Sequence, residues 1–511
     1  MTKYIVSIDQ GTTSCRSFIF DKDGKTLGMG QKEFAQHYPQ PGWVEHDAQE
    51  IFETQVDCIK EAVKSAGIKS EDIAAAGITN QRETTVVWDK SNDKPIHNAI
   101  VWQCRRTQEA AEQLRSDSSI REKTGLFPDA YFSGLKIQWI LDNVNGARAK
   151  AEAGDLQFGT IDSWLIRKFT KDKNHLTEPS NASRSMLFNI KDMDWDEALL
   201  KKLNVPRSMM PKVVPSNADF GLTDKKLLGF EAPILATLGD QQAALFGQCC
   251  FEQGMMKCTY GTGSFLLGNI GNEIRLTDGL LTTVGWQLEG EDPIYAFEGA
   301  IFVTGAAVQW LRDGLGLIES SDETEELATS LDSNEGVYFV PALVGLGAPW
   351  WNSDVRGTIV GLTRGTKREH LVRAALEAMA YQVADVTTNM KEHGIDVSEL
   401  RVDGGATRNN FMLQFQADVL EVPVLRASQV ESTAWGVAAL AALKAGLIKD
   451  LPELSKNWKS DALVKPVVDR KDQYQGWKAA LAGAIAGAAL SHASIEPGSK
   501  ERSTAGAKLG S

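Results

Sequence analysis

The stretch YIVSIDQGTTSCRSFIFDKDG, residues 4–24, decides the fold of this chain. An apolar run stops at Asp9, gives way to a polar turn at Gly11 to Ser14, and resumes as a second run of β-prone residues. Asp23-Gly24 is a hairpin signal, so a β-meander is predicted. The polar turn offers backbone N–H groups and hydroxyl donors at a glycine, which suits a phosphate group. It lacks the lysine of a P-loop and the third glycine of a dinucleotide fingerprint.

Strands and helices are predicted to alternate after this meander. The segment from Asp47 to Glu50 resembles a capping box and opens an amphipathic helix that should stop near Gly67. Strands are expected in IAAAGIT (73–79) and TTVVWD (84–89). A buried strand then turns at Gly239-Asp240 into a helix, so an α/β class is predicted.

The opening pattern recurs in MMKCTYGTGSFLLGNIG, residues 255–271. A strand, a Gly-Thr-Gly-Ser turn at 261–264 and a second apolar strand follow one another, as in the first meander. We interpret this as an internal duplication with its boundary between Cys249 and Gly254. Two domains would then face each other, each offering a turn to the same ligand. The alternative is chance recurrence of such turns in a chain with 45 glycines.

Length and composition are those of an ordinary globular protein. With 511 residues the chain is too long for one core, so two or three domains are expected. The formal net charge of −13 predicts no nucleic acid partner. No run of 18 apolar residues and no signal-type leader occur in the sequence, so we expect no membrane span and a cytoplasmic location. The six cysteines lack C-x-x-C spacing, and reduced thiols are expected.

Residues 491–511 mix Ser, Gly, Lys and Glu without periodicity and are predicted to form a flexible tail. Ala507-Lys508-Leu509 is similar to C-terminal tripeptides that address proteins to peroxisomes, but Gly510-Ser511 follow it. A chance tripeptide is the favoured interpretation. A peroxisome-like organelle is the alternative if the tripeptide is the native C-terminus.

Two aspartates, Asp9 and Asp240, each follow an apolar strand. Ligand sites of open α/β sheets lie at the carboxyl ends of strands. Phosphoryl transfer needs Mg²⁺ and a group that orients or deprotonates the acceptor hydroxyl, and these carboxylates are the candidates. Alone, either aspartate would more often be a turn residue or a helix cap.

The block ITNQRETTVVWD places Arg82 beside Glu83, a multi-donor fork next to an acceptor, which suits a neutral polyol. An ordinary surface ion pair is the favoured alternative on this feature alone. Trp102 and Tyr131 could wall such a pocket, although an isolated tryptophan is more often part of the core. The Gly404-Gly405 turn would allow close approach of a ligand, but such turns usually only reverse the chain.

Together these blocks make the chain resemble the FGGY family of carbohydrate kinases from Tyr4 to about Trp477. YFSGLKIQWI (131–140) is similar to the first family signature, and GTIVGLTRGTKREHLVRAALE (357–377) is similar to the second. Seven further blocks resemble the versions found in family members that act on glycerol: IDQGTTS, GITNQRETT, IVWQCRRT, SNASRSMLFN, GDQQAALFGQ, TYGTGSF and VDGGATRNN.

The resemblance implies an α/β fold of two actin-like (RNase H-like) domains around a central ATP cleft. An N-terminal FGGY domain, residues 1–250, would bind glycerol and phosphate, and a C-terminal FGGY domain, residues 251–490, would bind nucleotide. The implied reaction is ATP-dependent phosphorylation of glycerol to sn-glycerol 3-phosphate with Mg²⁺, in a homodimer or homotetramer.

The resemblance also implies residue roles. Asp240 would be the general base, and Asp9 would help to hold Mg²⁺. The glycerol site would comprise Arg82, Glu83, Trp102, Tyr131, Asp240, Gln241 and Phe265. ATP would be bound by Thr12, Thr13, Ser14, Arg16, Thr262, Gly305, Gln309, Gly405 and Asn409.

Departures from the family pattern concern regulation. Residues 216–235 lack the glycine- and arginine-rich loop with which some bacterial members bind a sugar bisphosphate. They also lack the histidine that is phosphorylated in other members. Neither control is therefore expected to operate. Trp350, Asn352 and Trp435 also depart from the usual residues and are assigned no function.

Two other functions are alternatives. A kinase of a longer sugar such as xylulose or gluconate would need a different residue set at Arg82, Glu83 and Trp102. An actin- or chaperone-like ATPase that phosphorylates nothing would explain the two phosphate turns, but not the family signatures or the polyol pocket.

Overall fold

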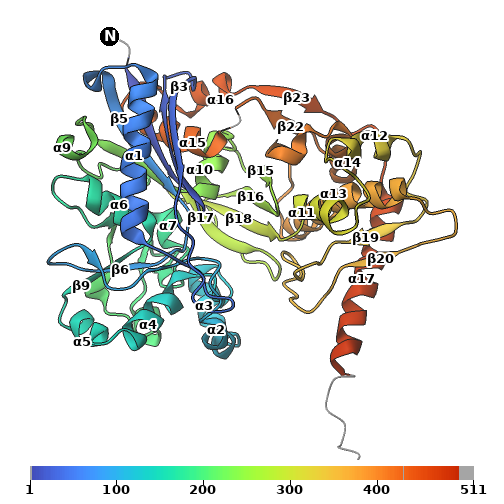
Figure 1. The fold of residues 1–511 in the computed structure, drawn as a ribbon, viewed down its shortest axis with the longest axis horizontal. Helices are drawn as coiled ribbons and strands as arrows, with labels where there is room; N and C mark the ends of the chain where they lie inside the picture. Colours follow the sequence, from blue (N-terminus) through green and yellow to red (C-terminus); the bar gives the residue numbers. More distant parts are fainter. Residues whose placement is uncertain (1–2, 430, 494–511) are drawn as a thin grey trace, which may run out of the picture.

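The computed structural model describes residues 3–429 and 431–493, and two large β-sheets dominate it (Figure 1). The first sheet has five strands in the order β14-β5-β1-β2-β3. Its members are β1 (Tyr4–Gln10), β2 (Ser14–Phe20), β3 (Thr26–Glu33), β5 (Ile73–Asn80) and β14 (Ile234–Gly239).

The second sheet has seven strands in the order β17-β18-β16-β15-β21-β22-β23. They are β15 (Met255–Tyr260), β16 (Ser264–Gly271), β17 (Leu281–Trp286), β18 (Ile294–Ile301), β21 (Glu399–Asp403), β22 (Val424–Ala427) and β23 (Ser460–Val464).

The two sheets repeat one topology, which confirms the predicted duplication. In the first, β1 pairs antiparallel with β2 and parallel with β5, and β14 continues the parallel order. In the second, β15 pairs antiparallel with β16 and parallel with β21, and β22 continues it. The antiparallel β2–β3 pair likewise corresponds to β16–β18.

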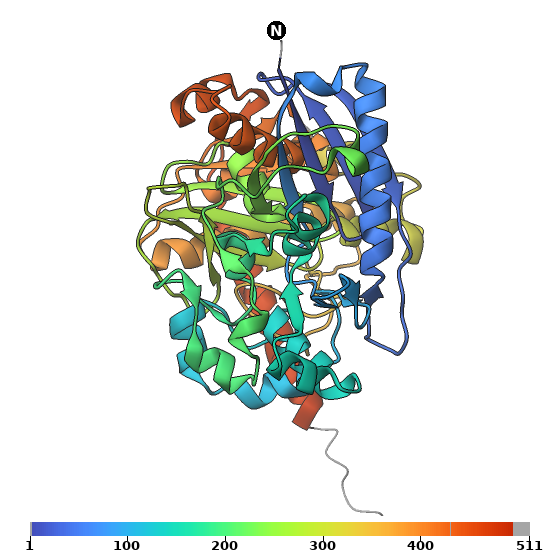
Figure 2. The ribbon, with the colours of Figure 1, turned by 90° about the vertical axis from the view of Figure 1, so that its left-hand side faces the viewer.

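Helices cover the first sheet on both faces, as Figure 2 shows. On one side, α1 (Ala48–Ala66) packs on β2 and β3, where a Cβ at Gly28 or Gly30 would lie within 2.5 Å of a helix atom. On the other side, α15 (Ser432–Lys444) packs on β1, β5 and β14. The chain therefore returns from the second half of the sequence to complete the first core.

A second helix makes the reciprocal crossing. α10 (Asp240–Gly247) follows β14 of the first sheet but contacts β15, β16 and β17 of the second. It crosses α15 so closely that a Cβ at Gly436 would lie 1.8 Å from the carbonyl oxygen of Ala243. A Cβ at Gly247 would lie 2.1 Å from that of Ser432. The crossing of α10 and α15 joins the two sheets.

Smaller elements surround the sheets. The helices between β5 and β14 are α2 (Gln108–Leu114), α3 (Ser118–Thr124), α4 (Ser133–Asn143), α5 (Ala147–Glu152), α6 (Ile161–Phe169), α7 (Pro179–Ala182), α8 (Glu197–Lys202) and α9 (Lys225–Leu228). Those around the second sheet are α11 (Gly305–Gln309), α12 (Glu323–Thr329), α13 (Arg368–Glu392), α14 (Asn410–Leu420), α16 (Leu451–Asn457) and α17 (Lys471–Ala493).

Short strands form small sheets beside these helices. They are β4 (Glu45–His46), β6 (Val86–Asp89), β7 (Lys94–Pro95), β8 (Ala99–Ile100), β9 (Leu156–Gly159), β10 (Leu176–Thr177), β11 (Phe188–Asn189), β12 (Asp194–Trp195), β13 (Lys212–Val213), β19 (Tyr338–Val340) and β20 (Thr358–Val360).

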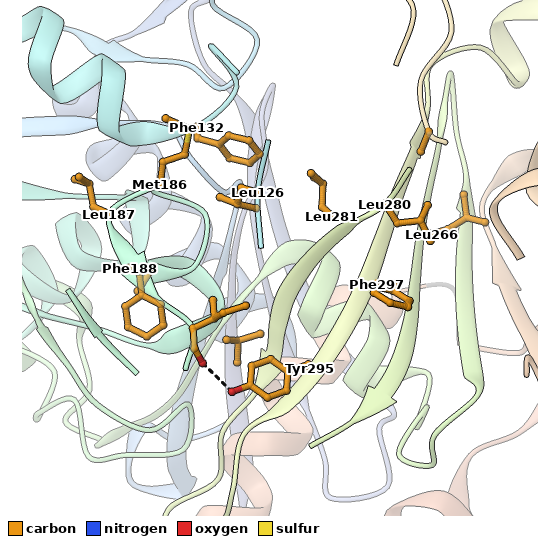
Figure 3. Close-up of a cluster of buried hydrophobic side chains, with 14 of the residues drawn as sticks. Leu126, Phe132, Met186, Leu187, Phe188, Leu266, Leu280, Leu281, Tyr295 and Phe297 are labelled. Carbon is orange, nitrogen blue, oxygen red and sulfur yellow. Dashed lines mark hydrogen bonds between the residues drawn. The ribbon is translucent and has the colours of Figure 1, made fainter. Parts of the chain in front are cut away.

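One buried core spans the segments that join the two halves (Figure 3). Phe132, Met186 and Phe188 come from the region between β5 and β14, and Leu281 and Phe297 come from the second sheet. In the same core the hydroxyl of Tyr295 on β18 donates to the carbonyl of Ile190 at 2.7 Å. The second sheet is thus packed directly against the region that carries Tyr131 and Trp102.

The local signals in the sequence correspond to observed elements. Asp47 caps α1 by accepting hydrogen bonds from Gln49 N and Glu50 N at 2.8 and 3.3 Å, and Gly67 ends the helix with φ 63°. Gly24 has φ 82° in the predicted hairpin, where a side chain would be strained. The predicted strands in residues 73–79 and 84–89 and the turn into α10 are also confirmed.

At the other end of the chain, α17 continues to Ala493, so the first three residues of the predicted tail are helical. Ala507-Lys508-Leu509 lies outside the described residues. In the described part of the chain, no helix has the length and apolar character needed to cross a membrane. All six cysteines are buried and unbridged.

Candidate active site

Two polar turns lie at the carboxyl ends of equivalent strands. The first, which holds Thr12, Thr13 and Ser14, joins β1 to β2 and is closed by the Gly11 N–H, which donates to the Ser14 carbonyl at 3.0 Å. The second, which holds Thr262, joins β15 to β16 and is closed by the Gly261 N–H, which donates to the Gly263 carbonyl at 2.9 Å. Because the strands correspond in topology, the turns occupy corresponding positions in the two halves.

The second turn is tied to the start of α11. Gly305 N–H donates to the carbonyl of Gly261 at 3.0 Å, and a Cβ at Gly305 would lie 2.5 Å from that oxygen. Only a glycine allows the helix to begin this close to the turn. Gln309 is exposed at the other end of α11, and Asn409 caps α14 by accepting from Met412 N at 2.9 Å.

A cavity of about 660 Å³ lies between the two halves. Its lining includes Arg16 from β2, Thr259 from β15, and Asp403, Gly404 and Gly405 from the end of β21. Arg16 and Gly405, which come from different halves of the sequence, therefore meet at one cavity. The other predicted ATP-binding residues do not line it: Thr12, Thr13, Ser14, Thr262, Gly305, Gln309 and Asn409.

Arg16 connects two carboxylates at this cavity. Its Nη2 lies 2.5 Å from Oδ2 of Asp9, and its Nη1 lies 2.7 Å from Oε2 of Glu431, which precedes α15. Burial raises the pKa of Asp9, and the guanidinium of Arg16 opposes that rise. The sequence analysis missed Glu431, because no local pattern connects it to Arg16, 415 residues away.

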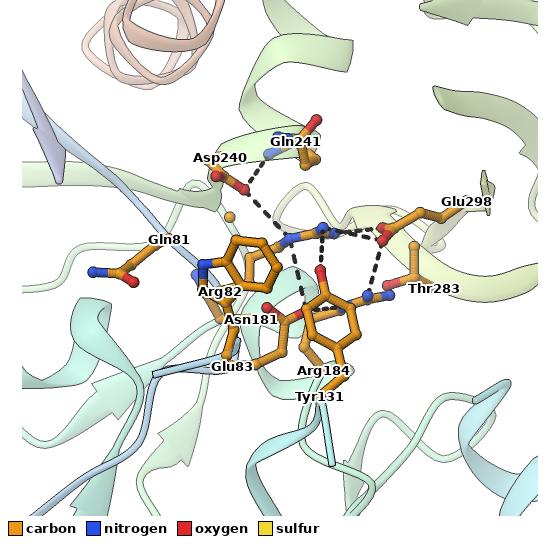
Figure 4. Close-up of polar contacts among 12 residues, drawn as sticks. Gln81, Arg82, Glu83, Tyr131, Asn181, Arg184, Asp240, Gln241, Thr283 and Glu298 are labelled. Atoms are coloured by element: carbon orange, nitrogen blue, oxygen red, sulfur yellow. Dashed lines mark hydrogen bonds and ion pairs between the residues drawn. The ribbon is translucent and has the colours of Figure 1, made fainter. Parts of the chain in front are cut away.

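The predicted polyol residues Arg82, Tyr131 and Asp240 converge, as Figure 4 shows. Nε of Arg82 lies 3.3 Å from Oδ1 of Asp240, and its Nη2 donates to the Tyr131 hydroxyl at 3.3 Å. The ring of Trp102 stands edge-on to that of Tyr131, with centroids 5.6 Å apart. Arg82 and Glu83 are 3% and 1% exposed, so the alternative of an ordinary surface ion pair is wrong.

Asp240 is the first residue of α10, and 30% of its side chain is exposed. Its recessed position raises the pKa of the carboxyl above the ordinary 3.8, although Arg82 favours the ionised form. The backbone N–H of Gln241 also donates to Asp240 Oδ1, at 2.7 Å. A carboxylate that is accessible and held by fixed donors can accept a proton from a bound hydroxyl.

Two predicted residues lie beside this group. The side-chain oxygen of Gln241 accepts a hydrogen bond from the buried ammonium of Lys257 on β15. Phe265 is half-buried on β16, opposite Thr259 and Ala300 in the strand register. Sequence reasoning missed Lys257, whose only signal is a charged residue in an apolar strand.

The sequence analysis did not identify two further charged residues that contact the Arg82–Glu83 pair. Glu298 on β18 and Arg184 are both fully buried, and Arg184 Nε lies 2.7 Å from Oε1 of Glu83. Arg184 stands in the SNASRSMLFN block, but nothing local indicates its partner. Glu298 interrupts the apolar strand IYAFEGAI, and this placement is the one signal that could have identified it.

Family comparisons agree with this architecture. Residues 4–247 match the N-terminal domain of the FGGY family of carbohydrate kinases, and residues 256–445 match its C-terminal domain. The chain is 55% identical to "Glycerol kinase" from Caldanaerobacter subterraneus subsp. tengcongensis, covering 95% of this chain and 99% of that protein. It is also 55% identical to "Glycerol kinase" from Thermococcus onnurineus, covering 95% and 98%.

Solved structures share the fold. Plasmodium falciparum glycerol kinase with ADP superposes with a TM-score of 0.90 at 34% identity, covering 95% of this chain and 98% of that one. Gluconate kinase from Lactobacillus acidophilus has a TM-score of 0.87 at 20% identity, covering 96% and 99%, and so bears on the fold alone. Two halves of one topology, a cavity between them and matches to both family domains lead to one conclusion: this chain belongs to the FGGY family of carbohydrate kinases.

Proposed function

We propose that this protein transfers the γ-phosphoryl group of ATP to glycerol and forms sn-glycerol 3-phosphate. The observation that carries the proposal is the Arg82–Asp240 pair at 3.3 Å, bounded by Tyr131 and Trp102. A fork of donors and a carboxylate beside two aromatic rings suits a short polyol. The 55% identity to proteins named glycerol kinase supports the same substrate.

Asp240 is the proposed general base. It would take the proton of the acceptor hydroxyl as the oxygen attacks phosphorus, while Arg82 and the Gln241 N–H hold its carboxylate in place. Arg82, Glu83, Tyr131 and Gln241 would orient the hydroxyl groups, and Trp102 and Phe265 would pack on the carbon edge.

ATP would bind between the two turns and along the cavity. Thr12, Thr13 and Ser14 would meet the phosphates from one half and Thr262 from the other, with Arg16 as the cation. Gly305, Gln309, Gly405 and Asn409 would hold the rest of the nucleotide. Tethering of the triphosphate by both halves would place the γ-phosphoryl group near Asp240.

Asp9 would help to hold Mg²⁺, which when bound neutralises charge on the transferred phosphoryl group. In the described residues no group of three or more His, Cys, Asp or Glu side chains could hold a metal ion alone. This fits Mg²⁺, which proteins hold with one or two carboxylates together with substrate phosphates and water. Asp9 is buried in β1, one residue before the strand ends at Gln10 and two before Gly11, where the first phosphate turn begins.

A coupled ADP-release assay tests the proposal. ATP and Mg²⁺ are supplied with glycerol, with xylulose, with gluconate, or without an acceptor. We expect turnover with glycerol and little with the other three. Preference for xylulose or gluconate would assign a longer sugar, and equal turnover without an acceptor would indicate an ATPase that phosphorylates nothing.

A further inference from the structure

Glu298 links the second sheet to the proposed glycerol site. It lies on β18 with no exposed surface, and its carboxylate bridges two arginines of the other half (Figure 4). Oε2 lies 2.5 Å from Nη1 of Arg82, and Oε1 accepts from Nη2 of Arg82 at 3.0 Å. Oε1 also accepts from Nη2 of Arg184 at 2.9 Å. One buried carboxylate therefore holds both guanidinium groups.

The charges in this group balance. Arg82 and Arg184 carry two positive charges, and Glu83 and Glu298 carry two negative charges, all in side chains at most 2% exposed. Burial opposes ionisation of Glu298, but Arg184 and Arg82 outweigh it and keep its pKa below the ordinary 4.5. Removing one partner of such a group leaves an uncompensated buried charge, which is strongly unfavourable.

The bidentate contact also determines how Arg82 faces Asp240. Glu298 engages both Nη atoms of Arg82, and this orientation leaves Nε 3.3 Å from Asp240 Oδ1. A planar guanidinium cannot turn one edge without moving the other. Without Glu298, the Nη groups would turn toward the remaining carboxylates, Glu83 and Asp240.

We propose that Glu298 is a positioning residue for the acceptor site, and that through Arg82 it makes glycerol binding depend on the packing of β18 against the first half. This inference rests on the proposed function. The contacts of Glu298 are to Arg82 and Arg184, so Glu298 would act on the acceptor and on Asp240 through Arg82. Glu298 would set the direction of the Arg82 N–H donors and the charge around Asp240.

The charge of Glu298 affects the ionisation of Asp240 in a defined direction. The charged groups around Asp240 are Arg82 after β5, Lys257 on β15, Glu298 on β18 and Asp9 on β1. Replacing Glu298 by glutamine removes a negative charge and leaves the group one unit more positive. The ionised form of Asp240 then gains stability, and the acid limb of the pH profile moves to lower pH.

Kinetics of Glu298→Gln test the proposal. We expect KM for glycerol to rise about tenfold, the scale of losing a charged hydrogen bond, while KM for ATP stays within about twofold. The acid limb of kcat/KM for glycerol should move down by about 0.5 to 1 pH unit. An unchanged KM for glycerol together with an unchanged limb would overturn the inference.

Tyr295→Phe is the matched control. It removes another hydrogen bond from β18 to the first half, the 2.7 Å contact with Ile190, without touching either arginine. Both kinetic effects should be absent from this variant. If it reproduces them, the cause is general loosening of β18 and the proposal fails.

A second variant covers the case in which Glu298→Gln does not fold. Glu298→Gln combined with Arg184→Gln keeps the group neutral, so the acid limb should return toward that of the unmodified protein while KM for glycerol stays high. A normal KM for glycerol in this double variant would overturn the inference. Failure of the proposed function is distinguishable, because the unmodified protein would then show no glycerol-dependent turnover.

Discussion

The indole N–H of Trp102 donates to Oγ1 of Thr12 at 3.0 Å, so a wall of the proposed glycerol pocket is bonded to the first phosphate turn. The same ring lies against Tyr131. Trp102 and Thr12 are 90 positions apart in the sequence. Trp102 belongs to the proposed glycerol site and Thr12 to the proposed phosphate site, and the two sites must act together. A shift of the indole on glycerol binding would therefore reach the phosphate turn directly.

Trp102→Phe removes this hydrogen bond but keeps an aromatic wall. We expect KM for ATP to rise about fivefold, because a neutral hydrogen bond contributes about 1 kcal/mol, with a smaller change in KM for glycerol. Steady-state kinetics with each substrate varied in turn measures both constants. Thr12→Val removes the same bond together with the proposed phosphate contact of Thr12, so its KM for ATP should rise at least as much, and adding Trp102→Phe to it should raise KM for ATP little further. Additive effects would show that the contact is not the cause.

Asp240→Asn removes the proposed base without changing the shape of the side chain. Turnover should fall by two orders of magnitude or more, the scale of general-base catalysis, while ATP binding persists. Single-turnover assays and nucleotide titration measure the two properties separately. Asp47→Asn is the control, because asparagine also caps a helix and α1 lies outside the site. Near-normal turnover of Asp240→Asn would refute the role of base.

The raised pKa of Asp240 sets the expected pH dependence. Burial raises the pKa above 3.8, and only the ionised form can accept a proton. The kcat/KM for glycerol should therefore fall on acidification, with a midpoint above that of a free aspartate. Arg82→Gln removes a charge that favours ionisation, so its midpoint should move higher still. Tryptophan fluorescence over the same range distinguishes this from acid unfolding, and a midpoint unmoved in Arg82→Gln contradicts the assignment.

Local sequence signals predicted most of the fold because they act over a few residues. The capping residue Asp47, the turn glycine Gly24 and the strand-to-helix turn at Asp240 each specify their own geometry. The repeated turns also predicted a duplication, because each copy carries the same local pattern.

The charged residues behind the site could not be predicted in this way. Arg82 and Glu298 are 216 positions apart, and their contact exists only because β18 packs against the first half. Glu298 in an apolar strand was a visible anomaly, but one sequence does not say which buried cation it meets. Glu431 was less visible still, because a glutamate before a helix is ordinary.

Arg16 and Glu431 give a pair of predictions with opposite signs. Arg16→Gln removes the proposed phosphate cation, and KM for ATP should rise about tenfold. Glu431→Gln frees Arg16 from a carboxylate at 2.7 Å, so KM for ATP should fall by about two- to threefold. KM for glycerol should stay unchanged in both, and steady-state kinetics measures both constants for each variant. A rise in KM for ATP in both variants would indicate that Glu431 contributes to nucleotide binding itself.

One methyl group added where α10 crosses α15 should destabilise the protein. In Gly436→Ala the new Cβ would lie 1.8 Å from the carbonyl oxygen of Ala243, a backbone atom that cannot move without shifting α10. Such overpacking costs about 1–3 kcal/mol, so denaturant unfolding should show a lower free energy of unfolding.

Gly483→Ala in α17 is the matched control, since a Cβ there meets nothing within 4 Å. Alanine is the better helix former by about 1 kcal/mol, so this variant should be as stable as the unmodified protein or more so. Because both changes are Gly→Ala within a helix, propensity alone would make both stabilising. Opposite signs therefore locate the loss at the contact between α10 and α15, and an unchanged stability of Gly436→Ala would contradict the close crossing.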